Sequence, residues 1–582
     1  MPKIEVNEET FYALSGRRWT SKEELEEALV AAKAELDGGF GEESTIPEER
    51  IIKIELNDTN RPDLWGTAGC ARQLRLYYAD QRSDRKASGY SFFSTPKEMK
   101  STKHKVIIEK SVAKVRPFMV GFVATGKEIT DPMLRDMIQT QEKLAWNFGR
   151  RRRSISMGLY RTSIIKWPII YKGADPDSVS FVPLQWEESL TLREILKQHP
   201  KGKEYAFILE HENIHPLLTD STGAVLSYPP IINSADLGAV QVGDSEIFVE
   251  LTGTDQKAVT LAASIMACDL SDNGFTIEPA EMEYEYDTPL GKKCVTPFYF
   301  QEPVFCSLWR IEKFLGEKLS ADDCVAALAK MGVKASKDFD VEKAYDAKVE
   351  GIRAWPPEYR NDFLHAADVA EDVMIGRGLD SFKPEHPRDF TVGRLTPVTL
   401  FSRKVKELMT GMGYQEMIYN YLGSRKDLVE KMRGDGKSII RISNPMTENY
   451  EYVRDSIIAS LLTSEAVSGH SVYPHKFFEI GKITYWDNDS SITRQYLGFL
   501  HADRDANFNT AAAQIQTLFY YISREYEVQE SADPRFISGR AALILYKGKS
   551  IGVFGEVHPQ VLENWGVTFP CTAGEMDIED LL

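Results

Sequence analysis

The length of the chain is the property that most constrains its fold. At 582 residues the chain exceeds what one hydrophobic core supports, because cores stop growing at roughly 250–300 residues and longer chains divide into domains. Roughly three to five domains are therefore expected. Apolar residues make up 42% of the chain and charged residues 27%, a balance typical of folded globular proteins. We predict a multidomain α+β protein.

Hydropathy and cysteine usage exclude several classes of protein. No apolar run approaches the ~20 residues that span a bilayer, so we expect no membrane segment. The first residues lack the charged-then-apolar pattern of a signal peptide. Six cysteines are scattered without a C-x-x-C pair, which argues against a disulfide framework or a zinc ribbon. The sequence therefore predicts a cytoplasmic protein whose cysteines are small buried apolar residues.

The distribution of charge leaves nucleic-acid contact open. The net charge of −17 argues against a protein that coats nucleic acid, although segregated basic patches still permit local contact. Seven lysines and arginines stand against two acids between residues 82 and 105, and Arg150 to Arg153 are consecutive arginines. Spacing alone favours a solvated linker for the first segment and a solvated strand edge for the second. Phosphate binding is the alternative for both.

The first 80 residues predict a small mixed α/β module. Ser21 and Glu24 form a capping box, which starts a helix that we expect to continue through Leu36 and to end at Gly38–Gly39. A strand is expected at residues 51–56 and a second helix at about 67–78. Residues 81–114, which are basic and rich in serine and lysine, are predicted to form a linker.

Residues 115–285 predict an α+β domain with one strand face able to line a pocket. Apolar and polar residues alternate from Glu246 to Thr252, so Ile247, Val249 and Leu251 should share one face while Glu250 and Thr252 share the other. Thr254 is expected to cap the following helix, which runs to about residue 268.

Residues 286–385 and 386–582 predict two further domains. Two short amphipathic helices, around residues 309–315 and 320–331, meet at a tight joint and indicate a helix-turn-helix-like module. Asp322 and Asp323 on the second helix argue against DNA binding. In the last segment we expect a helix at 398–412, a hairpin around Lys547-Gly548-Lys549, and mostly antiparallel strands. Those strands are predicted at residues 438–442, 477–485, 496–501, 542–546 and 550–554.

Three groups of sequence strings, in this order along the chain, resemble one family. The first is Asn57-Asp-Thr-Asn-Arg-Pro-Asp-Leu-Trp65. The second is Ser227-Tyr-Pro-Pro-Ile-Ile-Asn-Ser234, followed by Glu250-Leu-Thr-Gly-Thr-Asp255. The third is Asn444-Pro-Met-Thr-Glu-Asn-Tyr-Glu-Tyr-Val-Arg454, with Phe477-Phe-Glu-Ile-Gly-Lys482 and Gly555-Glu-Val-His-Pro-Gln-Val-Leu562. Together they cover nearly the whole chain, which resembles the phenylalanyl-tRNA synthetase β subunits of the archaeal and eukaryotic type.

This resemblance implies a partner, substrates and a domain order. The family forms an (αβ)₂ heterotetramer whose α subunit attaches phenylalanine to tRNA(Phe) with ATP. It implies an editing domain at residues 115–285 and a catalytic-like domain with a class II synthetase fold at 386–582. A class II site holds ATP phosphates with arginines, but no arginine follows Arg540, and the strand leading to Glu479 offers only His475 and Lys476. We therefore predict that the terminal domain does not aminoacylate, and that Arg454 forms a structural ion pair.

Four acids between residues 362 and 372 leave two interpretations open. Asp368, Glu371 and Asp372 have helical spacing that places them on one face, and Asp362 precedes them near the helix start. Spacing alone favours a solvated acidic face or salt bridges to a partner. Clustered carboxylates also suit Mg²⁺, and the resemblance implies a Mg²⁺ site at these four residues near the contact with the α subunit.

The resemblance also implies an editing pocket at Leu218, Ser227, Glu250 and Thr252. Tyrosine differs from phenylalanine by one hydroxyl, and a second site that hydrogen-bonds this hydroxyl discriminates strongly. The expected activity is hydrolysis of mischarged Tyr-tRNA(Phe). Family members often have Gly-x-Tyr-Asp where this chain has Gly158-Leu-Tyr-Arg161, a charge reversal near the expected pocket. The alternatives are a tRNA-binding scaffold with a vestigial pocket and an autonomous class II ligase, which the missing arginines oppose.

Overall fold

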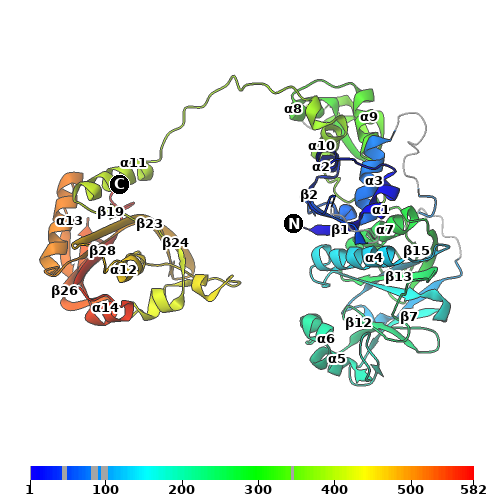
Figure 1. The fold of residues 1–582 in the computed structure, drawn as a ribbon, viewed down its shortest axis with the longest axis horizontal. Helices are drawn as coiled ribbons and strands as arrows, with labels where there is room; N and C mark the ends of the chain where they lie inside the picture. The colour runs from blue at the N-terminus through cyan, green and yellow to red at the C-terminus, as the bar shows by residue number, and fades with distance from the viewer. Residues whose placement is uncertain (1, 42–48, 80–89, 94–101, 343–346) are drawn as a thin grey trace. The chain divides into compact units, whose positions relative to one another are not determined.

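The computed structural model describes residues 2–41, 49–79, 90–93, 102–342 and 347–582. The chain forms two compact units, Met1–Glu385 and His386–Leu582, each of which is described by itself (Figure 1). Among the described residues no helix combines the length and the apolar character that a membrane span requires.

The unit that begins the chain opens with a small antiparallel sheet. Its strands lie in the order β1-β3-β2, and its elements are β1 (Lys3–Asn7), β2 (Ala34–Gly38), β3 (Ile51–Leu56), α1 (Glu8–Ser15), α2 (Lys22–Leu29) and α3 (Thr67–Tyr78). The helix expected from Ser21 begins as predicted, because the Ser21 side chain accepts from the Glu24 amide. Its expected end was wrong. Lys33 adopts a left-handed conformation with φ of 53°, so the chain turns, and Leu36 lies on β2 opposite Ile54.

A large sheet follows, with strand order β12-β11-β10-β7-β4-β14-β5-β13-β6 and β15 paired to β14. Its strands are β4 (Lys105–Ile108), β5 (Phe118–Thr125), β6 (Ile155–Arg161), β7 (Ile169–Ala174), β10 (His215–Thr219), β11 (Val225–Tyr228), β12 (Ile232–Asn233), β13 (Glu246–Gly253), β14 (Thr276–Tyr284) and β15 (Lys293–Thr296). The associated helices are α4 (Asp131–Lys143), α5 (Leu192–Gln198), α6 (Pro200–Tyr205) and α7 (Gln256–Asp272), and β8 (Ser180–Phe181) pairs with β9 (Leu190–Thr191).

Part of the expected linker belongs to this sheet. Residues 80–89 and 94–101 lie outside the described residues, but Lys105–Ile108 forms β4 between β7 and β14. Val106 and Ile108 are fully buried there, and burial of these two apolar side chains outweighs the basic, linker-like composition around them.

The small first sheet and the large sheet share one hydrophobic core. Ile4 and Ile54 from the first sheet, Val249 and Leu251 from β13, and the inner face of α7 all belong to it. A buried ion pair reinforces the contact between α3 and α7, because Arg72 donates to Asp269 and Asp272. The helix α7 is capped by Asp255, whose side chain accepts from the Ala258 amide, and not by Thr254 as predicted.

The last part of this unit packs three helices with a three-stranded sheet. The sheet has the antiparallel order β16-β18-β17, with β16 (Val304–Ser307), β17 (Lys334–Glu342) and β18 (Ala347–Trp355). The two predicted helices are present as α8 (Leu308–Leu315), which ends at a left-handed Gly316, and α9 (Ala321–Lys330), which starts with a Ser320–Asp323 capping box. A third helix, α10 (Ala366–Arg377), shares their core. The strands were not predicted.

The unit His386–Leu582 is built on a seven-stranded sheet in the order β19-β23-β24-β28-β27-β26-β25. Its strands are β19 (Gln415–Glu416), β23 (His475–Asp487), β24 (Ser490–Ala502), β25 (Glu527–Glu530), β26 (Phe536–Tyr546), β27 (Lys549–Val557) and β28 (Cys571–Asp577). All neighbours are antiparallel except β19 and β23. A small second sheet contains β20 (Leu422–Gly423), β21 (Ile440–Arg441) and β22 (Tyr452–Val453).

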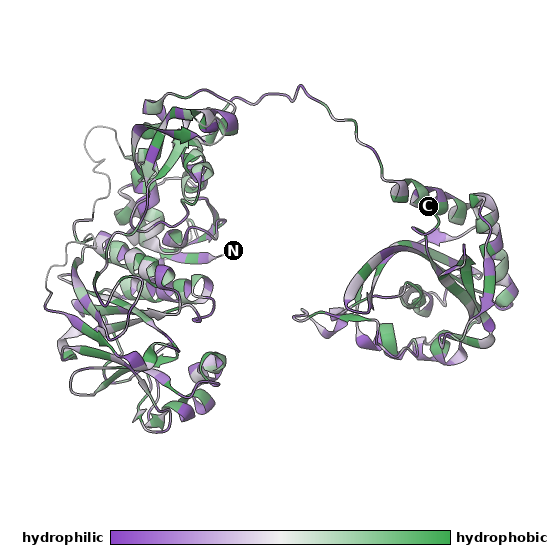
Figure 2. Cartoon of the chain, turned by 180° about the vertical axis from the view of Figure 1, so that it is seen from behind, coloured by the Kyte–Doolittle hydropathy of each residue, from purple (hydrophilic) through white to green (hydrophobic). Residues whose placement is uncertain are grey.

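Helices cover both faces of the seven-stranded sheet. α11 (Pro397–Gly411) and α13 (Phe508–Ile522) pack on one face, and α12 (Ile458–Val467) and α14 (Pro559–Trp565) pack on the other. The sheet curves around α12 (Figure 1), a helix of largely hydrophobic residues (Figure 2). The predicted strands are present, most of them longer than expected, and Lys547-Gly548 turns the β26–β27 hairpin with φ of 53° and 79°.

Candidate functional site

The four predicted pocket residues lie on strands of the large sheet. Glu250 and Thr252 are on β13, and Leu218 on β10 pairs directly with Ser227 on β11. All four side chains are buried. The predicted alternation of β13 is confirmed, because Ile247, Val249 and Leu251 enter the core shared with α7 while Phe248 packs in a separate core with Leu218.

A cavity of about 410 Å³ opens beside these strands, and two of the four residues line it. Ser227 and Glu250 are on its wall, together with Tyr160 of β6 and the Pro229–Pro230 turn. Its volume is within the range of small-molecule sites. Leu218 and Thr252 do not line the cavity. Leu218 belongs to the same buried core as Tyr160 and Phe248, and its role as an apolar wall stays a prediction.

Tyr160 joins the polar residues of the cavity into one cluster. Its hydroxyl lies 2.8 Å from Ser227 Oγ and 2.9 Å from Glu250 Oε2. The close approach depends on Gly158, two residues earlier on β6, because a Cβ there would overlap the Tyr160 hydroxyl and lie 2.5 Å from Glu250 Oε2. The string Gly158-Leu-Tyr160 therefore supplies both the hydroxyl and the space that it needs.

Thr252 contacts the cavity only indirectly, through hydrogen bonds with neighbouring residues. Its hydroxyl lies 2.9 Å from Ser156 Oγ, which lines the cavity. Arg116 donates from Nε to Thr252 Oγ1 at 3.0 Å and from Nη2 to the Thr252 carbonyl at 2.7 Å. Arg116 also donates to the Arg152 and Arg153 carbonyls. Thr252 and Arg116 thus hold β13 against the loop that precedes β6.

Burial gives Glu250 unusual acid–base properties. Desolvation raises the pKa of its carboxyl to about 7, against the lowering effects of the Tyr160 hydrogen bond and of Arg116. Burial also lowers the pKa of the Arg116 guanidinium to about 10. Glu250 Oε1 is buried and accepts no hydrogen bond from any of the described residues. An unpaired acceptor of this kind on a cavity wall is costly to leave unsatisfied.

Arg161, the residue of the expected charge reversal, does not line this cavity. Its guanidinium donates to Gln241 at 3.3 Å and lies 3.8 Å from Asp244. The positive charge is therefore compensated outside the cavity, and Tyr160 beside it keeps its contacts with Ser227 and Glu250.

The four acids of the predicted Mg²⁺ site have other partners. Arg360, fully buried, donates to Asp362 at 2.9 Å and to Asp372 at 3.0 Å. Burial works to raise the pKa of Asp362, but Arg360 outweighs it and holds that pKa well below its usual range. Asp368 accepts from the Leu364 and His365 amides, and Glu371 pairs with Lys33. Among the described residues no group of three or more metal-ligating side chains is arranged around a common point.

The chain by itself therefore does not fit the implied metal. Arginine, lysine and backbone amides of this same chain compensate the carboxylates, whereas the salt-bridge interpretation expected a partner to do so. A metal ion among these residues would have to replace Arg360 and Lys33 as the compensating charges.

Three arginines of the His386–Leu582 unit, Arg454, Arg494 and Arg535, form ion pairs with carboxylates. Arg454 and Glu479 pair in the interior, at 2.7 and 2.8 Å. Arg494 pairs with Asp577, and Arg535 with Asp533 and Glu575. Gly481 makes room for the first pair, because a Cβ there would overlap Arg454. Arg454 thus has the structural role that was predicted.

Comparisons with known proteins identify the family. Residues 304–379 match the family model of the tRNA synthetase B5 domain, and residues 384–578 match that of the phenylalanyl tRNA synthetase beta chain CLM domain. Phenylalanine–tRNA ligase beta subunits from Treponema pallidum subsp. pallidum and Borreliella burgdorferi are 44% and 45% identical over 616 and 587 residues. Both alignments cover 100% of each chain. The chain belongs to the phenylalanine–tRNA ligase β-subunit family.

A solved structure supports the fold, and one detail of the sequence prediction needs correction. An N-terminal fragment of the phenylalanyl-tRNA synthetase β subunit from Pyrococcus horikoshii matches with a TM-score of 0.56 and 32% identity, over 65% of this chain and 100% of the fragment. The multidomain α+β prediction is confirmed. Restriction to the archaeal and eukaryotic type was wrong, because Treponema and Borreliella are bacteria.

Sequence reasoning missed two residues of the site, Tyr160 and Arg116. Tyr160 directly precedes Arg161, and the spacing of Gly158 and Tyr160 places both on one strand face, which is the signal that indicates this contact. Arg116 precedes β5 and meets Thr252 across 136 positions of sequence. No local pattern indicates that contact.

Proposed function

We propose that this chain is the editing, non-aminoacylating β subunit of phenylalanine–tRNA ligase, and that the cavity beside Glu250 hydrolyses mischarged Tyr-tRNA(Phe). The observation that carries the proposal is the buried Glu250 on the cavity wall, whose Oε1 makes no hydrogen bond to the described residues, although the Thr252 side chain lies near enough to lower the pKa of the carboxyl. A phenol hydroxyl in the cavity would supply a donor. Phenylalanine has no hydroxyl and would leave the acceptor unpaired, which is the arrangement that discriminates strongly between such substrates.

The surrounding residues hold this acceptor in position. Tyr160 fixes the other Glu250 oxygen at 2.9 Å and contacts Ser227 at 2.8 Å. With a pKa of about 7, Glu250 exchanges a proton near neutral pH, so it accepts a hydrogen bond when ionised and donates one when protonated. An aminoacyl ester is already activated towards water. The residues therefore act by orienting the substrate and a water molecule in the cavity.

The test is deacylation by the chain assembled with its α subunit. Glu250→Gln should slow hydrolysis of Tyr-tRNA(Phe) about 10- to 100-fold, the value of a charge-assisted hydrogen bond of roughly 1.5–3 kcal/mol. Thr252→Arg should also slow it, because Arg116 and Ser156 then lose their partner. Glu246→Gln, at the exposed end of the same strand, is the matched control.

Equal rates for Glu250→Gln and the control would remove the pocket assignment. Failure of the wild type to hydrolyse Tyr-tRNA(Phe) would instead support the alternative of a tRNA-binding scaffold with a vestigial pocket.

The remaining parts of the proposal concern assembly. We infer an (αβ)₂ heterotetramer with tRNA(Phe) as ligand, in which the α subunit uses ATP and Mg²⁺. The assignment of ATP use to the α subunit is supported by ion pairs in this chain. Arg454, Arg494 and Arg535 already have carboxylate partners and are not free to bind ATP phosphates. Co-expression with a candidate α subunit and mass measurement of the complex tests the assembly. Pyrophosphate exchange by the isolated chain with ATP and phenylalanine would contradict the assignment of aminoacylation to α.

A further inference from the structure

The four consecutive arginines form an unusual loop beside the cavity. Arg150–Arg153 connects β6 to the π-helical turn η5 (Leu144–Phe148) at the end of α4. Arg150, Arg151 and Arg152 have φ of 51°, 56° and 65°, a left-handed conformation that non-glycine residues seldom adopt in succession. Hydrogen bonds from the Arg151 and Arg152 amides to the carbonyls of Trp146 and Ala145 hold it. Strained backbone and π-helical turns are both frequent at functional sites.

The charges of this loop have no carboxylate partner in the described parts of the chain. Arg150, Arg151 and Arg153 are exposed, and none of the four arginines is within ion-pair distance of an acid described here. Arg18 and Arg193, which are also exposed, pair with acids. A chain with a net charge of −17 has many carboxylates, so a cluster of uncompensated arginines points to a partner that carries the negative charge.

Aromatic side chains stand among these arginines. Arg151 Cζ lies 5.1 Å from the ring centre of Trp146, and Arg152 Cζ lies 4.3 Å from that of Tyr205. Arg153 Cζ lies 4.8 Å from that of Phe207. Stacking orders the guanidinium groups and leaves their in-plane N–H donors available. Trp146 remains 44% exposed.

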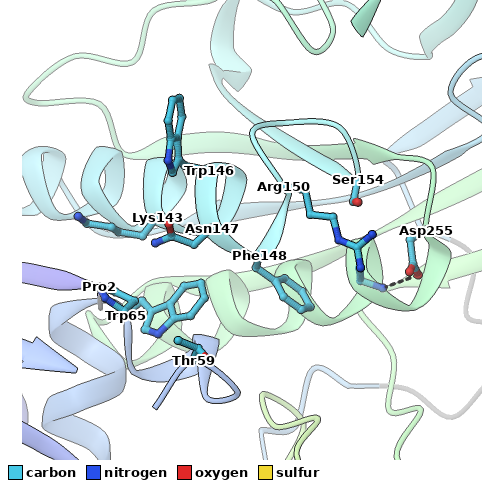
Figure 3. Close-up of a pocket in the computed structure, with 11 residues that line it drawn as sticks. Pro2, Thr59, Trp65, Lys143, Trp146, Asn147, Phe148, Arg150, Ser154 and Asp255 are labelled. Carbon is cyan, nitrogen blue, oxygen red and sulfur yellow. Dashed lines mark hydrogen bonds between the residues drawn. The ribbon is translucent and has the colours of Figure 1, made fainter. Parts of the chain in front are cut away.

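The arginine loop lies along a series of adjoining hollows. A hollow of about 680 Å³ is lined by Arg150, Trp146 and Lys143, and the next, of about 610 Å³, shares the last two. Figure 3 shows the Trp146 side chain standing out from the helical segment that also carries Lys143. The second hollow shares Arg152 and Lys201 with the Glu250 cavity.

Arg152 connects the loop directly to that cavity. It donates from Nη1 to the Pro230 and Ile231 carbonyls at 3.1 and 3.0 Å, on the turn that forms the cavity wall. The three hollows and the loop are called the arginine groove below. It runs from the open surface around Trp146 to Glu250.

We propose that the arginine groove binds the single-stranded 3′ end of the tRNA whose ester enters the cavity. The proposal rests on the proposed function and specifies the surface that the RNA follows. A base stacks on the exposed face of Trp146, and the phosphates contact Arg150, Arg151 and Lys143. Single-stranded nucleic acids are bound by this combination of basic groups and aromatic platforms. A double-stranded partner would offer no free base to Trp146.

The experiment compares two substrates of the assembled α–β enzyme. Misacylated Tyr-tRNA(Phe) reaches both groove and cavity, whereas 3′-O-tyrosyl-adenosine is short enough to occupy only the cavity. Trp146→Ala should raise KM for the tRNA roughly tenfold, since one base stack is worth about that factor, and the double variant Arg150→Gln/Arg151→Gln, which removes two phosphate contacts, should raise KM by at least as much. Hydrolysis of the adenosine ester should keep its wild-type rate and so report that the variants fold.

A second measurement identifies the contact as electrostatic. Loss of each phosphate contact should reduce the slope of log affinity against log salt by about 0.7 for a single strand. Arg193→Gln is the matched control, because this exposed arginine of α5 is ion-paired with Asp177 and lines none of the three hollows. Unchanged KM in both Trp146→Ala and the double variant, together with an unchanged salt slope in the double variant, would overturn the proposal.

The two proposals fail in different ways. If the wild type hydrolyses neither substrate, the editing function is wrong, and the arginine groove is judged by affinity for deacylated tRNA with and without its single-stranded 3′ end. The double variant should then lose affinity only for the intact tRNA. If the double variant loses affinity equally for tRNA with and without the 3′ end, or loses none, the RNA binds elsewhere and the proposal for the arginine groove is wrong.

Discussion

The pKa of Glu250 makes the stability of the Met1–Glu385 unit depend on pH. Burial raises the pKa of this carboxyl from 4.5 to about 7. As pH rises, the unfolded chain releases this proton first, whereas the folded chain keeps it until about pH 7. The unfolded state therefore gains stability from ionisation between these two pKa values, and the free energy of unfolding falls across that window.

The size of this effect follows from the two pKa values. Each unit of difference corresponds to about 1.4 kcal/mol, so a shift from 4.5 to about 7 lowers the free energy of unfolding by roughly 3 kcal/mol above neutral pH. Between about pH 5 and pH 8.5 the free energy of unfolding of the wild type should fall by roughly 2–3 kcal/mol because of this carboxyl. The Glu250→Gln variant has no titrating proton at this position, so its free energy of unfolding should not show this fall.

The free energy of unfolding of this unit alone is measured by urea titration, with hydrogen–deuterium exchange of peptides from β6 and β13 as the signal. The stability of Glu250→Gln relative to wild type should rise by roughly 2–3 kcal/mol between about pH 5 and pH 8.5. Glu246→Gln, whose carboxylate is exposed at the end of the same strand, should keep the wild-type pH dependence. If the difference in free energy of unfolding between Glu250→Gln and the wild type stays constant across this pH range, the raised pKa of Glu250 does not control stability.

Three further predictions concern packing and charge. Gly158→Ala should separate Tyr160 from Glu250 and lower stability by roughly 1–3 kcal/mol in urea unfolding, because a Cβ overlaps the Tyr160 hydroxyl. Arg360→Ala should lower stability by roughly 3–5 kcal/mol, because two buried carboxylates lose their shared partner; an unchanged Tm would contradict this role. Chelation with EDTA should leave the Tm of the isolated chain unchanged, since these acids are already compensated; a fall in Tm would show that metal holds them.

Local signals in the sequence predicted local structure well. Ser21 and Ser320 mark helix starts that the structure contains, because a cap needs only a side chain and the next turn of backbone. The alternation along β13 was correct for the same reason, since the two faces of a strand follow directly from residue order. The hairpin at Lys547-Gly548 also depends only on adjacent residues.

Errors arose where distant residues decide the outcome. The composition around residue 105 is that of a linker, but β7 and β14 bury Val106 and Ile108 from both sides. Residue spacing placed the acids of α10 together, but it could not show that Arg360 lies between Asp362 and Asp372. Sequence reasoning therefore identified the cluster and left its compensating charge open.

Two of the strings that carry the family resemblance serve packing more than chemistry. In the first, Arg61 and Asp63 form a fully buried ion pair at 2.8 Å. In the third, Arg454 pairs with Glu479 in the interior. Removing one partner of such a pair leaves an uncompensated buried charge, which strongly opposes substitution of either residue. Glu250 differs from them, because it is buried with no paired cation at one oxygen. A carboxylate in that condition destabilises the fold above neutral pH, so a ligand accounts for Glu250 at this position better than packing does.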